Sequence, residues 1–396
     1  MNSTQRSVVL DALAAPSGGA LSGLVVADFS RVLAGPFATQ SLSDMGATVI
    51  KVESPDGDET RSWLPPERDG VSTYYLGINR NKRSITLNFG DAEDRAVALE
   101  IAARADIFVE NFKPGGLRKF GLDYESVKAI NPKIIYASIS GFGEEGGAKL
   151  PGYDLTVQAT SGLMSLTGDA NGATYRSGVS VFDIMTGMQA TVGILAALHH
   201  RENTGEGQRI SVNLLSTALA AMANHSSTYL AAGQVPSRMG NAHPSLFPYE
   251  PLPAKDGDII IVAANNGQFA SLCKTLGAPE LLEDSRFATV ELRNRNRDDL
   301  RPLLVEALSK KTKQEWFLEL SAAGVACGPI NSIEDGFKLA EELGLRPVVE
   351  VGEGTSAVPV VRSPITFSAT PAQYYAKPPT LGEHGELIRE WLKESN

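Results

Sequence analysis

The chain has 396 residues, of which 42% are hydrophobic and 21% are charged, and its formal net charge is −10. This composition is ordinary for a globular protein, and the length is enough for a large core and two domains. The acidic balance argues against bulk attraction to nucleic acid or to an anionic membrane, and no run approaches the roughly 18 apolar residues of a membrane span. We therefore expect neither a nucleic acid nor a membrane as a partner.

The cysteines and the N-terminus bear on location. Cys273 and Cys327 are too few and too far apart for a disulfide framework or a zinc site, so we expect a reducing, cytoplasmic setting and no bound metal. Residues 1–20 lack the order of a signal peptide, because their apolar run is short and is broken by Asp11. We expect them to form a loose arm.

The first half of the chain alternates between short apolar strands and helices. We expect strands at Leu24–Phe29, Thr48–Glu53, Ser84–Phe89, Asp106–Phe112, Lys133–Ser140 and Arg209–Val212, and helices at Ala34–Met45, Ala92–Ala105 and 184–201. Apolar strands that alternate with helices predict a parallel sheet covered on both faces. The helix over 184–201 is apolar all round, so it should be buried between layers.

The pattern changes after Gly207. A helix is expected at about 213–232, followed by a Gly/Pro-rich stretch, Gly233–Pro253, and a strand, Asp258–Ala264. Three helices are expected next, at 267–276, 298–308 and 312–323. The last expected elements are two strands, Val348–Val351 and Val358–Phe367, and a helix, Glu383–Lys393. We interpret the chain as a large Rossmann-like α/β domain interrupted by a smaller inserted domain. The expected boundaries are 1–20 for the arm, 21–204 for the first part of the large domain, 205–230 for a linker helix, 231–325 for the small domain, and 326–396 for the return linker and the rest of the large domain.

A single carboxylate, Asp183, lies among apolar residues at the start of the long helix. It has two interpretations. It can be a helix N-cap that accepts backbone N–H groups, or it can be a nucleophile. An aspartate at its ordinary pKa of about 3.9 would be ionised at neutral pH, as a nucleophile must be.

The run Gly141–Gly146 matches the dinucleotide fingerprint G-x-G-x-x-G but fails its context. A helix should open there to meet a pyrophosphate, whereas Glu144 and Glu145 would repel phosphate and Pro151 follows soon after. We therefore expect a glycine-rich loop near an active site, with backbone N–H groups that stabilise an oxyanion, and no dinucleotide. No G-x-S-x-G elbow of a serine hydrolase is present.

Seven short motifs together carry a family resemblance. They are Arg31–Pro36, Gly46–Glu53, Asn81–Ser84, Val109–Gly115, Gly152–Asp154, the segment around Asp183, and Cys327–Pro329. In this order and spacing, from about Leu21 to the C-terminus, the chain resembles the family III CoA-transferases, which include formyl-CoA transferase, carnitine CoA-transferase and alpha-methylacyl-CoA racemase. The resemblance implies transfer of CoA from an acyl-CoA thioester to a free carboxylic acid. We expect a small acid, with a dicarboxylate such as succinate as the first candidate, and no permanently bound cofactor.

The resemblance also implies roles for particular residues. Asp183 matches the aspartate that attacks the thioester and forms the covalent intermediate. CoA carries phosphates that need cations and backbone donors, and the positions carried over as CoA-binding are Arg31, Leu33, Ala34, Lys51, Lys82, Arg83, Asn111, Phe112, Lys113 and Lys119. For any one of these cations, a solvated surface charge is the alternative. Leu33 stands where formyl-CoA transferase has a substrate-contacting glutamine, which puts oxalate specificity in doubt. Ser54 stands where that enzyme has an arginine near the nucleotide.

The pair Tyr153-Asp154 bears on the reaction type. The racemases of this family have a histidine at the first of these positions, whereas the transferases have an aromatic residue followed by a carboxylate. Tyr153, with an ordinary pKa of about 10, suits proton exchange at an α-carbon poorly. We expect Tyr153 and Asp154 to support transfer, with a structural hydrogen bond as the alternative for Asp154 and 2-methylacyl-CoA racemisation as the alternative activity.

Two further expectations come from the resemblance. The segment Gly240, Asn241, Ala242, His243, Pro244 and Ser245 matches the mobile loop over the active site of formyl-CoA transferase, and we expect it to contact the substrate. Family III enzymes are homodimers of interlocked rings, and the predicted linkers at 205–230 and 326–332 would permit the same arrangement here. The expected partners are therefore acyl-CoA, a small carboxylic acid and a second copy of the chain.

Overall fold

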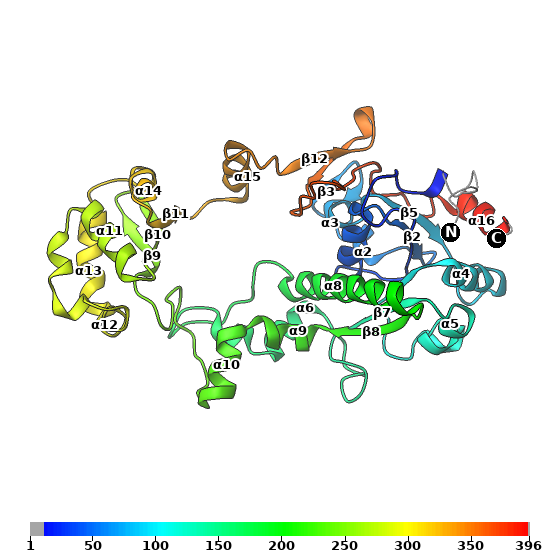
Figure 1. The fold of residues 1–396 in the computed structure, drawn as a ribbon, viewed down its shortest axis with the longest axis horizontal. Coiled ribbons are helices and arrows are strands. Elements are labelled where there is room, and N and C mark those ends of the chain that lie inside the picture. The colour runs from blue at the N-terminus through cyan, green and yellow to red at the C-terminus, as the bar shows by residue number, and fades with distance from the viewer. Residues whose placement is uncertain (1–11, 395–396) are drawn as a thin grey trace. The chain divides into compact units, whose positions relative to one another are not determined.

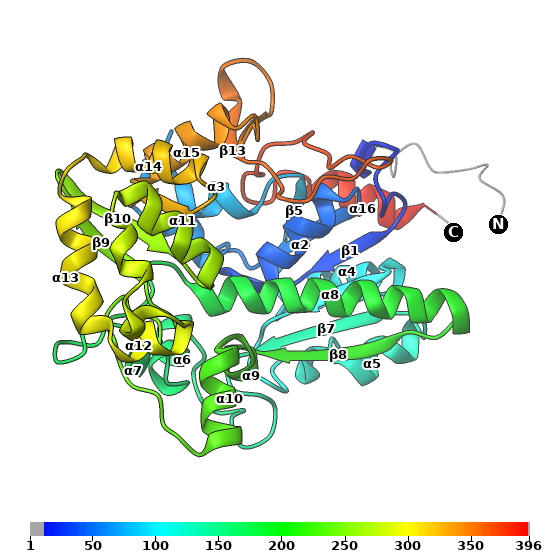
Figure 2. The same ribbon diagram turned by 60° about the vertical axis from the view of Figure 1, so that its left-hand side comes forward.

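The computed structural model describes residues 12–394, which form two compact units (Figures 1 and 2). The large unit contains the chain up to Leu163, Ser177–Gly233 and the chain from Arg346 on. The small unit contains Met164–Arg176 and Gln234–Leu345. It overlaps the small domain expected at 231–325, but it also includes an earlier segment and continues to Leu345.

A six-stranded parallel sheet forms the centre of the large unit. Its strands are β1 (Val25–Asp28), β2 (Thr48–Glu53), β5 (Lys82–Thr86), β6 (Ile107–Glu110), β7 (Ile135–Ser140) and β8 (Gln208–Asn213), in the order β5-β2-β1-β6-β7-β8. Every pair is parallel. Numbered along the chain, this order is 3-2-1-4-5-6, the arrangement of dinucleotide-binding folds. The predicted parallel α/β sheet is confirmed.

Helices cover both faces of this sheet (Figure 1). One face carries α2 (Ala34–Asp44) and α8 (Val181–Thr204), and the other carries α4 (Ala92–Arg104), α5 (Tyr124–Ile130) and α16 (Gly385–Lys393). By length and composition alone α8 could cross a membrane. In the fold, its residues Ile194 and Ala197 are buried in the core that α8 shares with α2 and the sheet.

The remaining elements of the large unit surround this sandwich. They are η1 (Glu59–Ser62), β3 (Glu67–Arg68), β4 (Val71–Ser72), α3 (Thr73–Ile78), η2 (Arg118–Phe120), α6 (Asp154–Thr160), α9 (Leu214–Ala221), α10 (Ala223–Ala232), β12 (Val348–Val351), η5 (Gly354–Ser356) and β13 (Val358–Val361), and α7 (Leu163–Leu166) begins at the boundary. The helix expected at 213–232 is thus two helices, with a break where Ala223 has a φ of 35°.

The described part of the expected loose arm is anchored, which corrects that prediction. Leu13 is fully buried in the core under α4 and α16. The N–H of Ala15 donates to Thr48 Oγ1 at 3.2 Å, and Arg83 Nε donates to the carbonyl of Leu13 at 3.1 Å. Residues 1–11 of the arm lie outside the described part of the chain.

The small unit has its own sheet and core. Antiparallel strands β9 (Tyr249–Ala254), β10 (Gly257–Val262) and β11 (Ala326–Pro329) lie in the order β11-β10-β9. They pack with α11 (Asn266–Leu276), η3 (Pro279–Leu282), η4 (Ser285–Phe287), α12 (Val290–Arg295), α13 (Arg297–Leu308) and α14 (Lys313–Ala322), and α15 (Ile333–Glu342) follows. The N–H of Gly240 donates to the carbonyl of Gly168 at 3.1 Å, which joins the two chain segments of this unit.

Candidate active site

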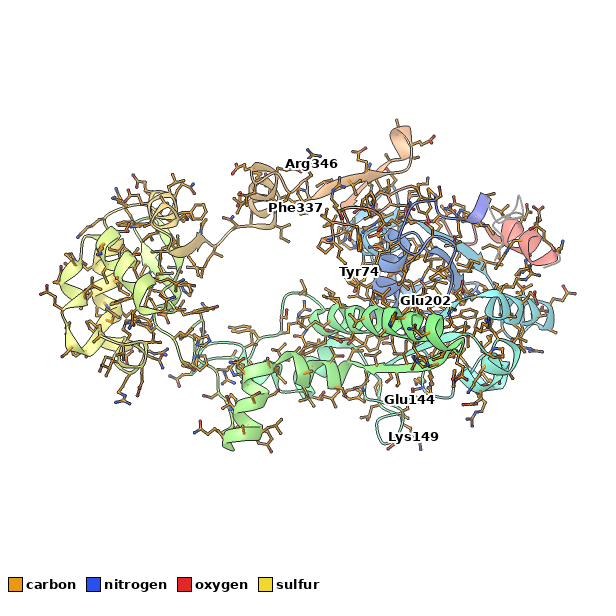
Figure 3. All side chains as sticks on the ribbon, viewed as in Figure 1. Tyr74, Glu144, Lys149, Glu202, Phe337 and Arg346 are labelled. Carbon is orange, nitrogen blue, oxygen red and sulfur yellow. The ribbon has the colours of Figure 1, made fainter. Side chains whose placement is uncertain are left out.

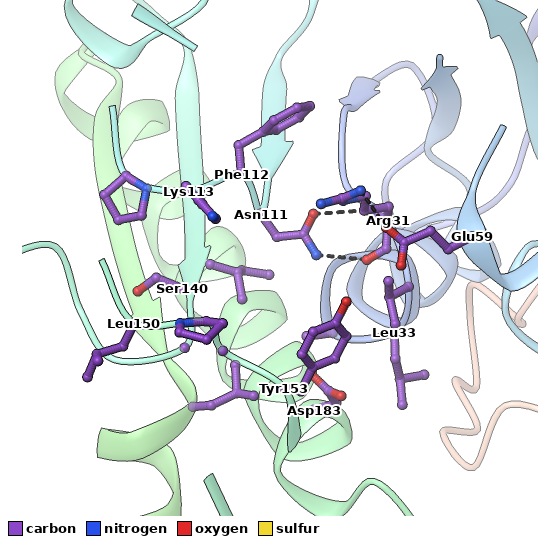
Figure 4. Close-up of a pocket in the computed structure, with 18 residues that line it drawn as sticks. Arg31, Leu33, Glu59, Asn111, Phe112, Lys113, Ser140, Leu150, Tyr153 and Asp183 are labelled. Carbon is purple, nitrogen blue, oxygen red and sulfur yellow. Dashed lines mark hydrogen bonds and ion pairs between the residues drawn. The ribbon is translucent and has the colours of Figure 1, made fainter. Parts of the chain in front are cut away.

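A pocket opens in the large unit where β1, β6 and β7 end (Figure 4). Its walls are Arg31–Ala34 after β1, Asn111–Pro114 after β6, Ile139–Gly141 at the end of β7, Leu150–Tyr153, Glu59, Asp183 and Leu214. In open α/β sheets, ligands bind at the carboxyl ends of the strands, where the strand order reverses. Here the reversal lies between β1 and β6, so the pocket occupies the place that the sheet topology favours.

The loop after β1 is held by side chains at successive backbone groups. Asn111 binds Arg31 twice, with the N–H of Arg31 donating to Oδ1 at 3.0 Å and Nδ2 donating to the carbonyl of Arg31 at 2.7 Å (Figure 4). Val32, at a φ of 68°, donates its N–H to the carboxylate of Asp58. In the described part of the chain, the N–H groups of Leu33 and Ala34 have no acceptor, because α2 begins there without a side-chain cap. Two uncommitted donors therefore lie at the pocket wall.

Close packing of two helices brings Asp183 to this wall. A Cβ on Gly187 would lie 2.5 Å from the carbonyl oxygen of Ala34, so only glycine lets α8 approach the start of α2 this closely. Asp183 and Gly187 are four residues apart and share one face of α8. The carboxylate of Asp183 therefore faces the N-terminal end of α2 and lines the pocket.

The N-cap interpretation of Asp183 is wrong. Helix α8 begins at Val181, and Asp183 lies within its first turn. The cap is supplied by Asp154 at the start of α6, whose Oδ1 accepts the N–H groups of Phe182 at 2.7 Å and Asp183 at 3.1 Å. Its Oδ2 accepts Nε2 of Gln158. A carboxylate suits this position because all three neighbours are donors, so the structural alternative for Asp154 accounts for its contacts.

The ionisation of Asp183 differs from the expectation. Burial, and then the charge of Asp154, raise the pKa of Asp183 to about 7. The carboxyl is therefore poised to titrate near neutral pH instead of being fully ionised there. Perturbation of this kind is common at functional sites.

Sequence reasoning missed two neighbours of the site. Tyr74 lies beside the start of α8 (Figure 3), where burial and the charge of Asp183 raise its pKa to about 12 and a hydrogen bond to Ser180 acts in the opposite direction. Glu110 ends β6 and accepts the N–H of Phe112 at 2.8 Å, and burial raises its pKa to about 7. Glu110 lies inside the Val109–Gly115 motif but has no chemical signature of its own, and Tyr74 lies outside all seven motifs, so only the fold reveals that both lie near the site.

Six of the ten residues predicted to bind CoA line the pocket. They are Arg31, Leu33, Ala34, Asn111, Phe112 and Lys113. Arg31 also forms an exposed ion pair with Glu59 at 2.6 Å, and Tyr153 lines the same pocket with 55% of its surface exposed. The structure thus assembles residues from four separate motifs at one place.

For Lys51 and Lys82, direct contact with a phosphate is a wrong prediction. Both side chains are fully buried, and they pair with Asp58 at 2.9 Å and Asp28 at 3.1 Å. A lysine without solvent access and with its charge already matched cannot reach a ligand at the surface. Arg83 and Lys119 lie outside the pocket walls, with their cationic groups over the rings of Tyr375 and Phe120, and their CoA contacts stay predictions.

The predicted substrate loop belongs to the small unit. The carbonyl of His243 accepts from Arg297 at 2.9 Å, the carbonyl of Pro244 accepts from Asn294 at 3.1 Å, and the N–H of Ser245 donates to Nδ1 of His243 at 3.0 Å. These contacts all lie within that unit, so a role for Gly240–Ser245 toward the pocket stays a prediction. Across residues 12–394, no group of three or more His, Cys, Asp or Glu side chains is arranged to hold a metal ion.

Comparison with known protein sequences identifies the family of this chain. The sequence profile described as CoA-transferase family III matches residues 21–385, and the chain belongs to that family. The resemblance drawn from its motifs is confirmed.

Relatives include a succinate–glutarate CoA-transferase of Agrobacterium fabrum, 44% identical over 92% of this chain and 93% of that protein. The human succinyl-CoA:glutarate CoA-transferase is 41% identical over 94% of this chain and 86% of that protein. Among solved structures, a CAIB/BAIF family protein from Brucella suis superposes with a TM-score of 0.85 at 43% identity, covering 95% of this chain and all of that one.

Proposed function

We propose that this protein transfers CoA from succinyl-CoA to a small dicarboxylate such as glutarate, with Asp183 as the nucleophile. The observation that carries the proposal is the poised carboxylate of Asp183, which lines the same switch-point pocket as Leu33 and Ala34, the residues with two uncommitted backbone donors. The names of the 44% and 41% identical relatives support the choice of donor and acceptor.

The reaction proceeds by covalent catalysis. The ionised carboxylate of Asp183 attacks the thioester carbonyl, the carbon–sulfur bond breaks, and a mixed anhydride and CoA thiolate result. The thiolate then attacks the aspartyl carbonyl, which releases succinate and leaves CoA as a thioester on Asp183. The acceptor carboxylate attacks this thioester to form a second mixed anhydride, and the thiolate attacks the acyl carbonyl of the acceptor. The new acyl-CoA leaves, Asp183 is regenerated, and no thioester is hydrolysed.

The N-terminal end of α2 supplies the electrostatic stabilisation. Each attack places negative charge on a carbonyl oxygen, and the N–H groups of Leu33 and Ala34 are available to bind it. The partial positive charge at a helix N-terminus acts in the same direction. These donors add to those expected from the glycine loop at Gly141, which lines the same pocket.

The pocket matches the reacting end of acyl-CoA better than the whole molecule. Its volume is about 180 Å³, below the roughly 300 Å³ at which pockets for complete small ligands begin. The acyl thioester would lie beside Asp183, and the nucleotide would extend outward past Arg31 and Lys113. Arg83 and Lys119 are the remaining candidates for its phosphates.

Racemisation of a 2-methylacyl-CoA is the competing activity, and Tyr153 argues against it. Incubation with a 2-methylacyl-CoA in deuterium oxide should give no uptake of deuterium at the α-carbon. Rapid uptake would favour the racemase.

The proposal includes an interlocked cytoplasmic homodimer. Apolar side chains on α8, α9 and α10 of the large unit are exposed in the single chain: Met188 at 54%, Val192 at 61%, Leu219 at 48%, Tyr229 at 59% and Leu230 at 80%. Such a surface marks an interaction site, and we assign it to a second copy. The loop Gly240–Ser245 would then set acceptor choice, so replacing His243 and Ser245 should reorder the preferred acids and leave affinity for CoA unchanged.

The deciding experiment replaces the nucleophile. Asp183→Ala should abolish CoA exchange between succinyl-CoA and a panel of acids, while the affinity for free CoA, measured by calorimetry, stays within about threefold of the wild type. Asp299→Ala is the matched control, because Asp299 occupies the same position in the first turn of α13 in the small unit. Substantial exchange by Asp183→Ala would end the covalent proposal.

A further inference from the structure

Val32 combines two features that rarely occur together. Its side chain is β-branched and its φ is 68°, in the left-handed region. For a β-branched residue this is a genuine outlier, and such a conformation persists only where the surroundings enforce it. Val32 lies at the pocket wall, directly before the two donors of Leu33 and Ala34.

A buried ion pair beneath the loop supplies the enforcement. Asp58 caps η1 through Thr60, whose N–H and hydroxyl donate to Oδ1 at 3.0 and 2.8 Å, and the same carboxylate accepts the N–H of Val32 at 3.3 Å. Lys51 Nζ donates to Asp58 Oδ2 at 2.9 Å and to the carbonyl of Ser30 at 3.1 Å. The pair therefore holds the backbone on both sides of Arg31. With Asn111 at Arg31 itself, side chains bind four consecutive polar groups of this backbone.

We propose that Asp58, held by its ion pair with Lys51, is a positioning residue for the transfer reaction. It fixes Val32 in the left-handed conformation and so orients the N–H groups of Leu33 and Ala34 toward the developing oxyanion. Neither Asp58 nor Lys51 lines the pocket, so the pair acts through the loop and not by contact with substrate. This inference rests on the proposed function for the identity of the oxyanion. The left-handed conformation that it explains does not depend on that function.

This role predicts how the kinetic constants divide. The negative charge of the oxyanion is absent from the bound substrate and develops in the transition state, so misplaced donors lower kcat and leave KM nearly unchanged. Asp58→Asn keeps an acceptor near Thr60 but weakens the hold on Val32. It should lower kcat by about 10- to 100-fold, the scale of a small displacement at a reacting centre, with KM for acyl-CoA within about threefold of the wild type.

A double-mutant cycle with Val32→Gly separates positioning from general damage. Glycine adopts a positive φ without enforcement, so in the Val32→Gly background Asp58→Asn should lower kcat by less than about threefold. Asp284→Asn is the matched control, because Asp284 caps η4 of the small unit in the same way, through the N–H of Arg286 at 2.9 Å, and it should leave kcat unchanged. If Asp58→Asn does not fold, the variant carrying Lys51→Met with it removes both buried charges together and enters the same cycle.

The outcomes are distinct. Equal losses of kcat in both backgrounds, or a loss carried by KM, would overturn the positioning role. If the wild-type protein shows no CoA exchange with any acid, the proposed function fails, yet the same four proteins still test the inference by melting temperature. Asp58→Asn should lower Tm less in the Val32→Gly background, and equal shifts would overturn it.

Discussion

The raised pKa of Asp183 predicts a pH dependence that ordinary aspartates do not give. Only the ionised carboxylate attacks the thioester, and its pKa in the folded protein is about 7. The ionised fraction then rises from about one tenth at pH 6 to about nine tenths at pH 8. Accordingly kcat/KM for succinyl-CoA, which reports groups of the free enzyme, should rise about tenfold over this interval and level off above it. This rise is the acid limb of the profile of kcat/KM against pH. The carboxyl groups of the substrates ionise near pH 4 and cannot produce it.

Two variants identify the group responsible. Asp154→Asn removes the neighbouring negative charge that helps to raise the pKa of Asp183, so the limb should move to lower pH. Glu110 is the competing carboxyl, because burial raises its pKa to about 7 as well. Glu110→Gln should leave the limb where it is. The assay is the initial rate of CoA exchange between pH 5 and 9 with succinyl-CoA below its KM. A limb near pH 4, or one that disappears in Glu110→Gln and stays in Asp154→Asn, would refute the assignment.

Three further perturbations test the packing and the assembly. Gly187→Ala places a Cβ 2.5 Å from the carbonyl oxygen of Ala34 and should lower the free energy of unfolding by about 1–3 kcal/mol through overpacking. The control is Gly336→Ala in α15, where a Cβ would have no atom within 4 Å, and this variant should be neutral or stabilising. Equal urea midpoints for the two variants would contradict the close approach of α2 and α8. Arg80→Ala leaves Asp44 buried without its bidentate partner and should lower the free energy of unfolding by about 3–5 kcal/mol. The control is Arg295→Ala, which breaks an ion pair whose side chains are 69% and 78% exposed and should change the urea midpoint little. Differently tagged dimers mixed under native conditions should form no hybrid over many hours but should form one after joint refolding; rapid native exchange, or an active monomer by sedimentation, would contradict interlocking.

The strands were predictable where β-branched residues predominate, and less so where a strand begins with charged residues or contains prolines. β2 and β12 match their expected bounds. β5 begins two residues earlier than expected, because Lys82 looks like a loop residue until its partner Asp28 is brought beneath it. β9 lies in a stretch that appeared too rich in proline for a strand. The prolines are tolerated because β9 is an edge strand, where Pro251 and Pro253 disrupt few hydrogen bonds between strands.

The site was predictable residue by residue only where a motif names a chemical group. Arg31, Asn111 and Asp183 come together as the strand order requires. The motifs cannot show which cations are exposed, so Lys51 was placed on a phosphate when it belongs to Asp58, seven residues away. Asp183 was similarly ambiguous, because capping and nucleophilic attack both favour an aspartate near a helix start, and Asp154 was open between support of transfer and a structural hydrogen bond. Only the contacts show that Asp154 accepts the N–H groups at the start of α8.

The last helix has a consequence for how the protein is made. Ile388 and Trp391 of α16 complete the core over α4, and the guanidinium of Arg104 holds the carbonyls of Trp391, Leu392 and Glu394. On the ribosome, the whole of the small unit emerges before α16 does. The large unit, although begun first, keeps an open hydrophobic face until α16 has emerged. A chain that ends before Gly385 therefore lacks the helix that covers its main core. Loss of this short segment should expose the nascent protein to chaperones and proteases.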